Sequence, residues 1–418
     1  MFSRLKHRIR SLSGTRGGLK RGRKISLAAM SVLGLVAIVF WSPIQRELTL
    51  RLVLRSASPD EGVVAELAGG ATDPAAVLER LWRAGTIPHR ALAINYLKNK
   101  APGDRELLRR ADALLLEATV DVDFTVRESA FGVLTALDHP RLSQAARDQL
   151  PDYDPQARVL GLRHLRRQKD SVPLPAIVRL LDDHDPFVVT SASAVLQAWT
   201  GQDFGIRQQM AIRRPAADDG PASDAESERK IAEGVHRWKE WWAAHQGEYA
   251  AEPQPAPYRP ARLSAQDFEL PDLSDKIVRL SEFRGKVVLL NFWTTWCASC
   301  RLEIPHLMEL QRRNPERLVV LGVSLDGLPD DHGHGHNHTE PGSLRQIVAR
   351  FVARTGINYR VLLDPKAAVG RRFNGNELPT NVFIDPEGFV RRRFIGGRSV
   401  RTFEAMLREL DGENRKGN

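Results

Sequence analysis

The sequence has 418 residues, enough for two or three domains, and its formal net charge is +10. Nine of its 61 basic residues lie in residues 1–24, which contain no acidic residue, so the rest of the chain holds 52 basic against 51 acidic residues. A near-neutral body with a basic tail excludes a broad basic surface for nucleic acid and favours a segment that orients the chain in a membrane.

Residues 25–45 predict a transmembrane anchor. The stretch is uncharged and rich in Leu, Val, Ile and Ala, and Trp41 lies near its far end, as is typical of a helix that crosses a bilayer. The basic tail before it, residues 1–24, places the N-terminus in the cytoplasm. We therefore expect a single-pass protein of the inner membrane whose remaining chain lies in the periplasm.

A cleaved signal peptide is the alternative interpretation of the same stretch. The long basic region and the absence of a small-residue cleavage site directly after the apolar run argue against cleavage.

Residues 59–250 predict an α-solenoid of HEAT-like repeats. Short apolar helices alternate with turns, and the turn residues Asp123, Asp154 and Asp185 recur at intervals of 31 residues. A fixed period of this kind is the signature of stacked helical units, which bind partners or act as spacers. The aspartates would cap the helices that follow them.

Two polar segments interrupt or end this region. Residues 213–232 predict a mobile loop because they are rich in Asp, Ser, Pro and Ala, and residues 251–261 predict a stiff linker because prolines alternate along them. Between the two, Trp238, Trp241 and Trp242 fall on one face of a helix. This spacing favours a core stripe that closes the end of the solenoid.

Residues 287–300 predict a buried strand that leads into a helix at a Cys-x-x-Cys motif. Unpaired N–H groups at a helix N-terminus stabilise a thiolate, which makes Cys297 the expected nucleophile. Cys300 would then resolve a mixed disulfide formed on Cys297. Half of a zinc ribbon is the alternative, but a ribbon needs a second ligand pair and the chain has only these two cysteines.

Two segments carry a family resemblance. Residues 291–305 (NFWTTWCASCRLEIP) and 377–385 (ELPTNVFID) resemble the active-site and cis-proline segments of TlpA/ResA-type thiol-disulfide oxidoreductases. The resemblance extends over about residues 263–410 and implies an α/β thioredoxin fold for residues 262–413. A peroxiredoxin would share Thr294, three residues before Cys297, but it would have a proline in place of Leu290.

The resemblance implies roles for several further residues. Glu303 takes the position of the family's active-site glutamate, where a carboxylate raises the pKa of nearby thiols and relays a proton. Considered without the resemblance, Glu303 would be a solvated surface carboxylate. Asn291 stands where ordinary thioredoxins have a buried aspartate, which leaves Glu303 to handle protons. Pro379 is expected to be cis.

The cis-proline loop is expected to face the cysteines and to pair with an extended segment of the substrate. The residues expected to contact the substrate are Trp296, Leu378, Pro379 and Thr380.

A histidine-rich insertion, residues 330–340, interrupts the thioredoxin-like region. Four histidines alternate within it: His332, His334, His336 and His338. Such a run binds copper, nickel or zinc through imidazole nitrogens, or it is simply a polar surface loop.

We therefore predict a membrane-anchored, periplasmic thiol-disulfide oxidoreductase that needs no cofactor beyond its own dithiol. By resemblance, it reduces disulfides of exported proteins in cytochrome c maturation or copper-site assembly, and a membrane thiol protein supplies the electrons. The alternatives are a protein that handles copper or zinc through the dithiol and the histidine loop, and a scaffold that binds a partner on its solenoid.

Overall fold

The computed structural model describes residues 43, 45–56, 59–100, 103–168, 173–207, 221–249, 263–328 and 343–414. The predicted linker and histidine-rich insertion lie outside the described residues, as does nearly all of the predicted membrane span. Within the described ranges, no helix combines the length and the apolar character that crossing a bilayer requires.

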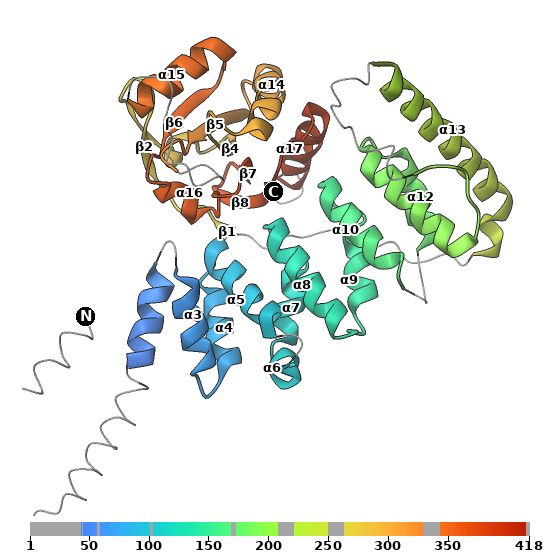
Figure 1. The fold of residues 1–418 in the computed structure, drawn as a ribbon, viewed down its shortest axis with the longest axis horizontal. Coiled ribbons are helices and arrows are strands. Elements are labelled where there is room, and N and C mark those ends of the chain that lie inside the picture. Colours follow the sequence, from blue (N-terminus) through green and yellow to red (C-terminus); the bar gives the residue numbers. More distant parts are fainter. Residues whose placement is uncertain are drawn as a thin grey trace, which may run out of the picture. The chain divides into compact units, whose positions relative to one another are not determined.

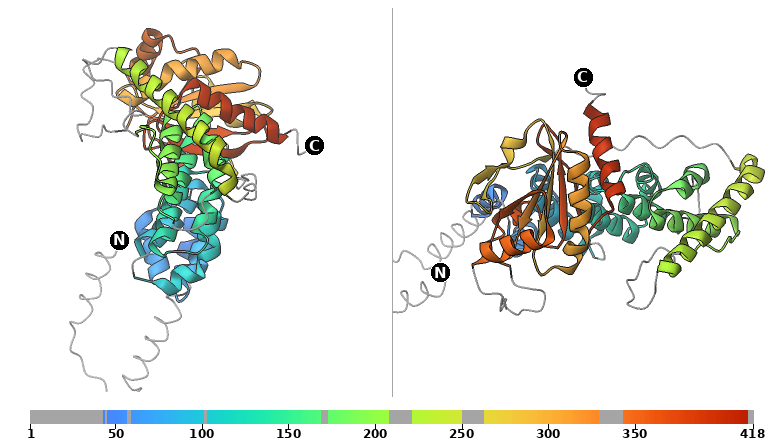
Figure 2. Two further views of the ribbon diagram at one scale, coloured as in Figure 1. Left: turned by 90° about the vertical axis from the view of Figure 1, so that its right-hand side faces the viewer. Right: turned by 90° about the horizontal axis from the view of Figure 1, so that it is seen from above.

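Residues 59–249, here called the helical region, contain the helices α3 to α13. Neighbouring helices pack against one another along this region, among them α3 with α4, α4 with α5, α9 with α10 and α11 with α12 (Figures 1 and 2). Their bounds are α3 Glu61–Gly69, α4 Pro74–Arg83, α5 Ile87–Lys100, α6 Arg105–Arg110, α7 Asp112–Ala118, α8 Phe124–Ala136, α9 Leu142–Asp148, α10 Pro155–Leu165, α11 Leu174–Arg179, α12 Pro186–Thr200 and α13 Pro221–His245.

Each of the three predicted turns begins a helix, because its second aspartate is an N-cap. The side chains of Asp123, Asp154 and Asp185 cap α8, α10 and α12 by accepting a backbone N–H two residues further on. The first aspartate of each turn instead binds an arginine of an earlier helix. These pairs are Arg90–Asp121 at 2.5 Å, Arg127–Asp152 at 2.7 Å and Arg158–Asp183 at 2.7 Å.

Helix α13 confirms one prediction and corrects another. Trp238 is buried and its indole N–H donates to Ser193 Oγ of α12 at 2.9 Å, so this member of the tryptophan stripe packs on the preceding helix, whereas Trp241 and Trp242 are half-buried. Residues 221–232 are helical, however, although we predicted a loop over 213–232. Ion pairs of Arg229 with Glu226 and Glu233 at helical spacing support the helix despite its polar composition.

The thioredoxin-like region, residues 263–414, is built on a six-stranded sheet of order β1-β8-β7-β4-β5-β6 (Figure 1). Strands β4, β5 and β6 are parallel, whereas β7 and β8 run antiparallel to their neighbours. The strands are β1 Leu263–Ser264, β2 Glu269–Pro271, β3 Ile277–Arg279, β4 Val287–Trp293, β5 Leu318–Ser324, β6 Arg360–Leu363, β7 Thr380–Ile384 and β8 Phe389–Ile395. The helices are α14 Ala298–Arg313, α15 Leu344–Thr355, α16 Ala368–Arg372 and α17 Val400–Asn414.

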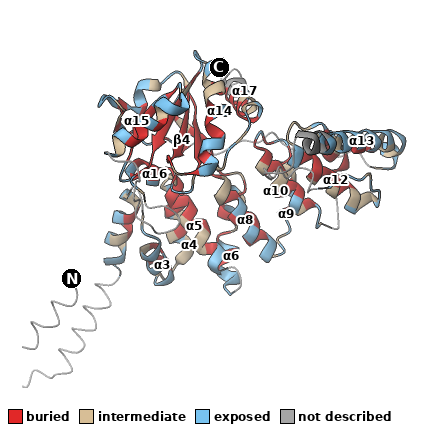
Figure 3. Cartoon of the chain, turned by 45° about the horizontal axis from the view of Figure 1, so that its top comes forward, coloured by how far each residue is buried: buried red, intermediate tan, exposed pale blue. Residues whose placement is uncertain are grey.

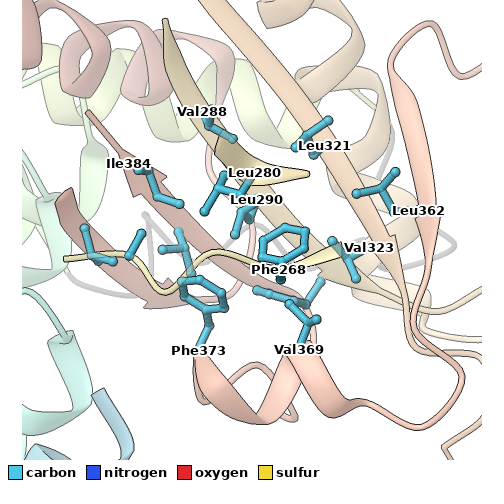
Figure 4. Close-up of a cluster of buried hydrophobic side chains, with 14 of the residues drawn as sticks. Phe268, Leu280, Val288, Leu290, Leu321, Val323, Leu362, Val369, Phe373 and Ile384 are labelled. Carbon is cyan, nitrogen blue, oxygen red and sulfur yellow. The ribbon is translucent and has the colours of Figure 1, made fainter. Parts of the chain in front are cut away.

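Strand β4 is buried along its whole length (Figure 3), because both faces of the sheet are covered. Helices α14, α15 and α17 pack on the face that carries Val287 and Leu289. The β2–β3 hairpin and α16 cover the opposite face, where Phe268 and Phe373 meet Leu290 (Figure 4). The continuous apolar run of β4 follows from this double burial.

The helical region and the thioredoxin-like region are joined by buried ion pairs along β8. Arg393 Nη1 lies 2.9 Å from Asp123 Oδ1, and Arg392 Nη1 lies 2.6 Å from Asp152 Oδ1. The backbone N–H of Arg393 also donates to the Val122 carbonyl at 2.8 Å. Burial alone would raise the pKa of Asp152, but the charges of Arg392 and Arg127 hold it below its ordinary value. These contacts combine the two regions into one packed unit.

Replacing Arg393 with Met should lower the free energy of unfolding by about 3–5 kcal/mol, because Asp123 would keep a buried charge without its partner. The measurement is the urea midpoint of the full chain. Arg408→Met, at an exposed position of α17, is the control. The double variant Arg393→Met/Asp123→Asn should recover part of the loss. Equal midpoints for Arg393→Met and Arg408→Met would contradict the importance of the pair.

Candidate active site

The Cys-x-x-Cys motif lies where β4 passes into α14, as predicted. Cys297 is the N-cap of α14, and its Sγ accepts the backbone N–H of Cys300 at 3.1 Å. The two sulfurs form a disulfide with an S–S distance of 2.10 Å. Cys297 is 7% exposed and Cys300 2%, so the first cysteine is the more accessible of two largely buried groups. This arrangement puts Cys297 at the positive end of a helix dipole.

The turn before Cys297 is held by a buried aspartate that the sequence did not point to. Asp326, just after β5, accepts hydrogen bonds from Thr295 N at 2.9 Å and Thr295 Oγ1 at 2.5 Å. From the other side, the Arg301 guanidinium donates to the Thr295 carbonyl at 2.6 Å and 2.9 Å. These contacts fix the backbone that presents the first cysteine.

Glu303 is buried, which corrects the alternative of a surface carboxylate. Its side chain is 2% exposed. Asn291 Nδ2 donates to Glu303 Oε2 at 2.9 Å, and Asn381 Nδ2 donates to Oε1 at 2.8 Å. The two asparagines lie opposite each other on β4 and β7 and are themselves linked at 3.0 Å. Both carboxyl oxygens are therefore satisfied by uncharged donors.

Burial raises the pKa of Glu303 to about 7. The hydrogen bond from Asn381, the charge and the backbone N–H of Arg398, and the hydrogen bond from Asn291 oppose this rise without cancelling it. A carboxyl group that titrates near neutral pH, one helical turn beyond Cys300, is suited to accept and return a proton.

The Leu378–Pro379 peptide bond is cis, as predicted. Leu378 and Trp296, both partly buried, pack against the apolar cluster that contains both cysteines. Thr380 corrects an expectation, because its side chain is fully buried and its hydroxyl donates to the Glu377 carbonyl. As the first residue of β7, Thr380 pairs with Phe292 of β4 and with Ile395 of β8.

The metal alternative gains no support from the described residues, which contain no group of three or more side chains placed to hold a metal ion. The four histidines on which that hypothesis rested lie outside the described residues.

The pKa of Glu303 predicts a pH dependence of stability. Between about pH 4.5 and pH 7 the folded chain keeps a proton that the unfolded chain has lost, so stability should fall as pH rises through this window, by about 3 kcal/mol in total. Glu303→Gln should remove that fall. The measurement is the urea midpoint of the oxidised protein from pH 4 to 8.

Glu316→Gln is the control for that experiment because Glu316 is exposed. The assignment is wrong if the Glu303→Gln and Glu316→Gln profiles coincide.

Several known proteins are similar to part of this chain. Residues 262–393 match the AhpC/TSA family. The thiol-disulfide oxidoreductase ResA of Oceanobacillus iheyensis is 30% identical over 152 residues, which are 35% of this chain and 71% of ResA. The thioredoxin-like protein YneN of Bacillus subtilis is 29% identical, over 35% of this chain and 78% of YneN.

Among solved structures, the exposed lipoprotein thioredoxin Etrx1 of Streptococcus pneumoniae is 27% identical, with a TM-score of 0.28 over 34% of this chain and 99% of Etrx1. The match to ResA covers more than two thirds of that protein. The chain therefore belongs, through its C-terminal region, to the ResA family of thiol-disulfide oxidoreductases.

Proposed function

We propose that this protein reduces disulfides of exported proteins, with Cys297 as nucleophile, Cys300 as resolving cysteine and Glu303 as proton acceptor. The observation that carries the proposal is the buried Glu303, held by Asn291 and Asn381 and titrating near neutral pH behind the dithiol. A site that only binds metal has no need for such a group.

The reaction proceeds in two exchanges. The Cys297 thiolate attacks one sulfur of the substrate disulfide, and the other sulfur leaves as a thiolate. Cys300 loses its proton toward Glu303 and attacks Cys297 Sγ, which breaks the mixed disulfide and releases the second substrate thiolate. The substrate gains two electrons, and the chain ends with the Cys297–Cys300 disulfide. A thiol protein of the membrane must then reduce that disulfide again.

The substrate would lie across Trp296, Leu378 and Pro379. Trp296 and Leu378 are only partly buried and pack on the cluster around the cysteines, which supports a shared contact surface. An extended segment is the substrate shape that the cis-proline loop favours. Exported apocytochromes and copper-site proteins are substrate classes that fit this arrangement.

The N-terminal part of the chain would place this chemistry outside the cytoplasm. We propose that residues 25–45 anchor the protein in the inner membrane, with residues 1–24 in the cytoplasm, because the basic tail precedes the apolar stretch. We also propose that the helical region is a HEAT-like solenoid. Its support is the 31-residue spacing of the helix-capping aspartates.

Cys300→Ser should trap substrates, because a mixed disulfide on Cys297 could no longer be resolved. Cells that express this full-length variant should yield disulfide-linked complexes in the carbonate-resistant membrane fraction, identified by mass spectrometry as exported proteins. Cys297→Ser is the matched control and should trap none. Complexes made up of cytoplasmic proteins would contradict the proposed location, and equal yields from the two variants would contradict the role of Cys297.

The reduction potential should lie at the thioredoxin end of the range, at about −250 mV or lower. The measurement is equilibration of the full chain in dithiothreitol or glutathione buffers, followed by alkylation and mass analysis. A potential near about −120 mV would show an oxidant that makes disulfides, and the reductive direction would be wrong.

A further inference from the structure

A short loop between β8 and α17, Gly396–Arg398, touches two parts of the redox site. The backbone N–H of Gly396 donates to the carbonyl of the cis-proline Pro379 at 2.8 Å. The backbone at Gly397 lies against Glu303, since a Cβ there would be 3.3 Å from Glu303 Cβ. The position of this loop therefore affects the surroundings of both Pro379 and Glu303.

The Arg398 side chain holds this loop in its conformation. Its Nη1 donates to the carbonyls of Ile395, Gly396 and Gly397 at 3.4, 3.2 and 3.1 Å. Its guanidinium lies over the Phe394 ring, 4.5 Å from the centroid, and the side chain is only 8% exposed. A planar guanidinium suits this combination of stacking and several hydrogen bonds, whereas an ammonium does not.

The negative charge opposite Arg398 comes from the helical region. Asp154 Oδ1 lies 3.6 Å from Arg398 Nη2, and the aspartate side chain is 5% exposed. Asp154 also caps α10 through the backbone N–H of Gln156 at 2.9 Å. The same carboxylate thus begins a helix of the helical region and faces the loop of the redox site.

Arg398 also acts on Glu303 by charge. Its guanidinium and its backbone N–H both lower the pKa of Glu303 against the effect of burial. Cys297 and Cys300, at the start of the same helix, form a disulfide and do not titrate in the oxidised chain. Tyr359, just before β6, is a titratable group that interacts with Glu303. The pKa of Tyr359 is raised by burial and by the charge of Glu303. The neighbours on β4 and β7, Asn291 and Asn381, carry no charge.

We propose that Arg398 is a positioning residue of the redox site and that the helical region acts on Glu303 through it. Asp154 attracts the guanidinium by its charge, at a distance too long for a hydrogen bond, and the guanidinium holds the Gly396–Arg398 loop against Glu303 and the cis-proline. The helical region then helps to position the redox site through Asp154, in addition to any role as a spacer or as a surface that binds a partner. The importance of Arg398 for catalysis rests on the proposed function, whereas the measurement of the pKa of Glu303 does not depend on it.

The test measures the pKa of Glu303 in the oxidised full chain. The infrared band of the protonated Glu303 carboxyl group is recorded as a function of pH. Glu303→Gln assigns the band. Arg398→Gln should raise the pKa of Glu303 by half a unit or more, because a positive charge and the support of the loop are lost. Arg398→Lys keeps the charge but loses the planar group that stacks on Phe394, so it should give a smaller rise.

Asp154→Asn separates the indirect effect from a direct one. Asparagine preserves the helix cap, so the variant should fold. The substitution should shift the pKa of Glu303 in the wild-type background and leave it unchanged in the Arg398→Gln background. A direct effect of the Asp154 charge would persist in both. Asp185→Asn is the matched control, because Asp185 caps α12 by the same contact, to the backbone N–H of Phe187.

Two outcomes would overturn the inference: an unchanged pKa in Arg398→Gln, or the same Asp154→Asn shift in both backgrounds. The rate at which each reduced variant cleaves a disulfide-linked peptide is recorded in parallel across pH 5–9. If the wild type shows no such activity but the titrations behave as expected, the proposed function fails and the role of Arg398 stands. If the activity is present but the pKa of Glu303 does not respond to the substitutions, the proposed function stands and the role of Arg398 fails.

Discussion

The burial of Glu303 is the constraint on which the arrangement of the redox site depends. A carboxyl group removed from water needs hydrogen-bond donors, and here they come from two adjacent strands. The antiparallel register of β4 and β7 sets Asn291 opposite Asn381, so that both amides reach the same carboxyl group. A shift of β7 by one residue would turn Asn381 to the other face of the sheet. Because β7 begins directly after Pro379, the same register also fixes the cis-proline loop.

The second constraint concerns the charges along β8, where each buried arginine forms an ion pair with a carboxylate. Three consecutive arginines in a strand suggest an exposed edge, yet Arg391, Arg392 and Arg393 are all about 3% exposed or less. Arg391 pairs with Asp385 of its own sheet at 3.3 Å, while the other two pair with aspartates of the helical region. The aspartates of these turns can do this because each serves two contacts: Asp123 caps α8 and binds Arg393. Asp152 binds both Arg127 and Arg392.

The sequence was informative wherever the signal is local. The strand, the helix start at Cys297 and the capping role of Asp154 follow from short-range rules, and the burial of Glu303 agrees with the family resemblance rather than with its polarity. Arg127 and Arg158 share the 31-residue spacing and could have been found with it. The pairs Asp152–Arg392 and Asp123–Arg393 join positions 240 and 270 residues apart, which no periodicity in one chain encodes. The prediction of a loop was wrong at the charged start of α13, because a solvated helix and a loop have similar amino-acid compositions.

One feature of β8 bears on how the protein can be divided. Among the described residues, β1 pairs with β8 at Phe389 and Val390, and further along β8 the backbone N–H of Arg393 donates to the Val122 carbonyl instead. Removing the residues before 263 would expose that edge of β8. It would also leave Arg392 and Arg393 without their partners Asp152 and Asp123. An uncovered edge recruits further strands and leads to self-association. The helical region thus covers a strand edge of the redox fold that would be open to pairing if the helices were removed.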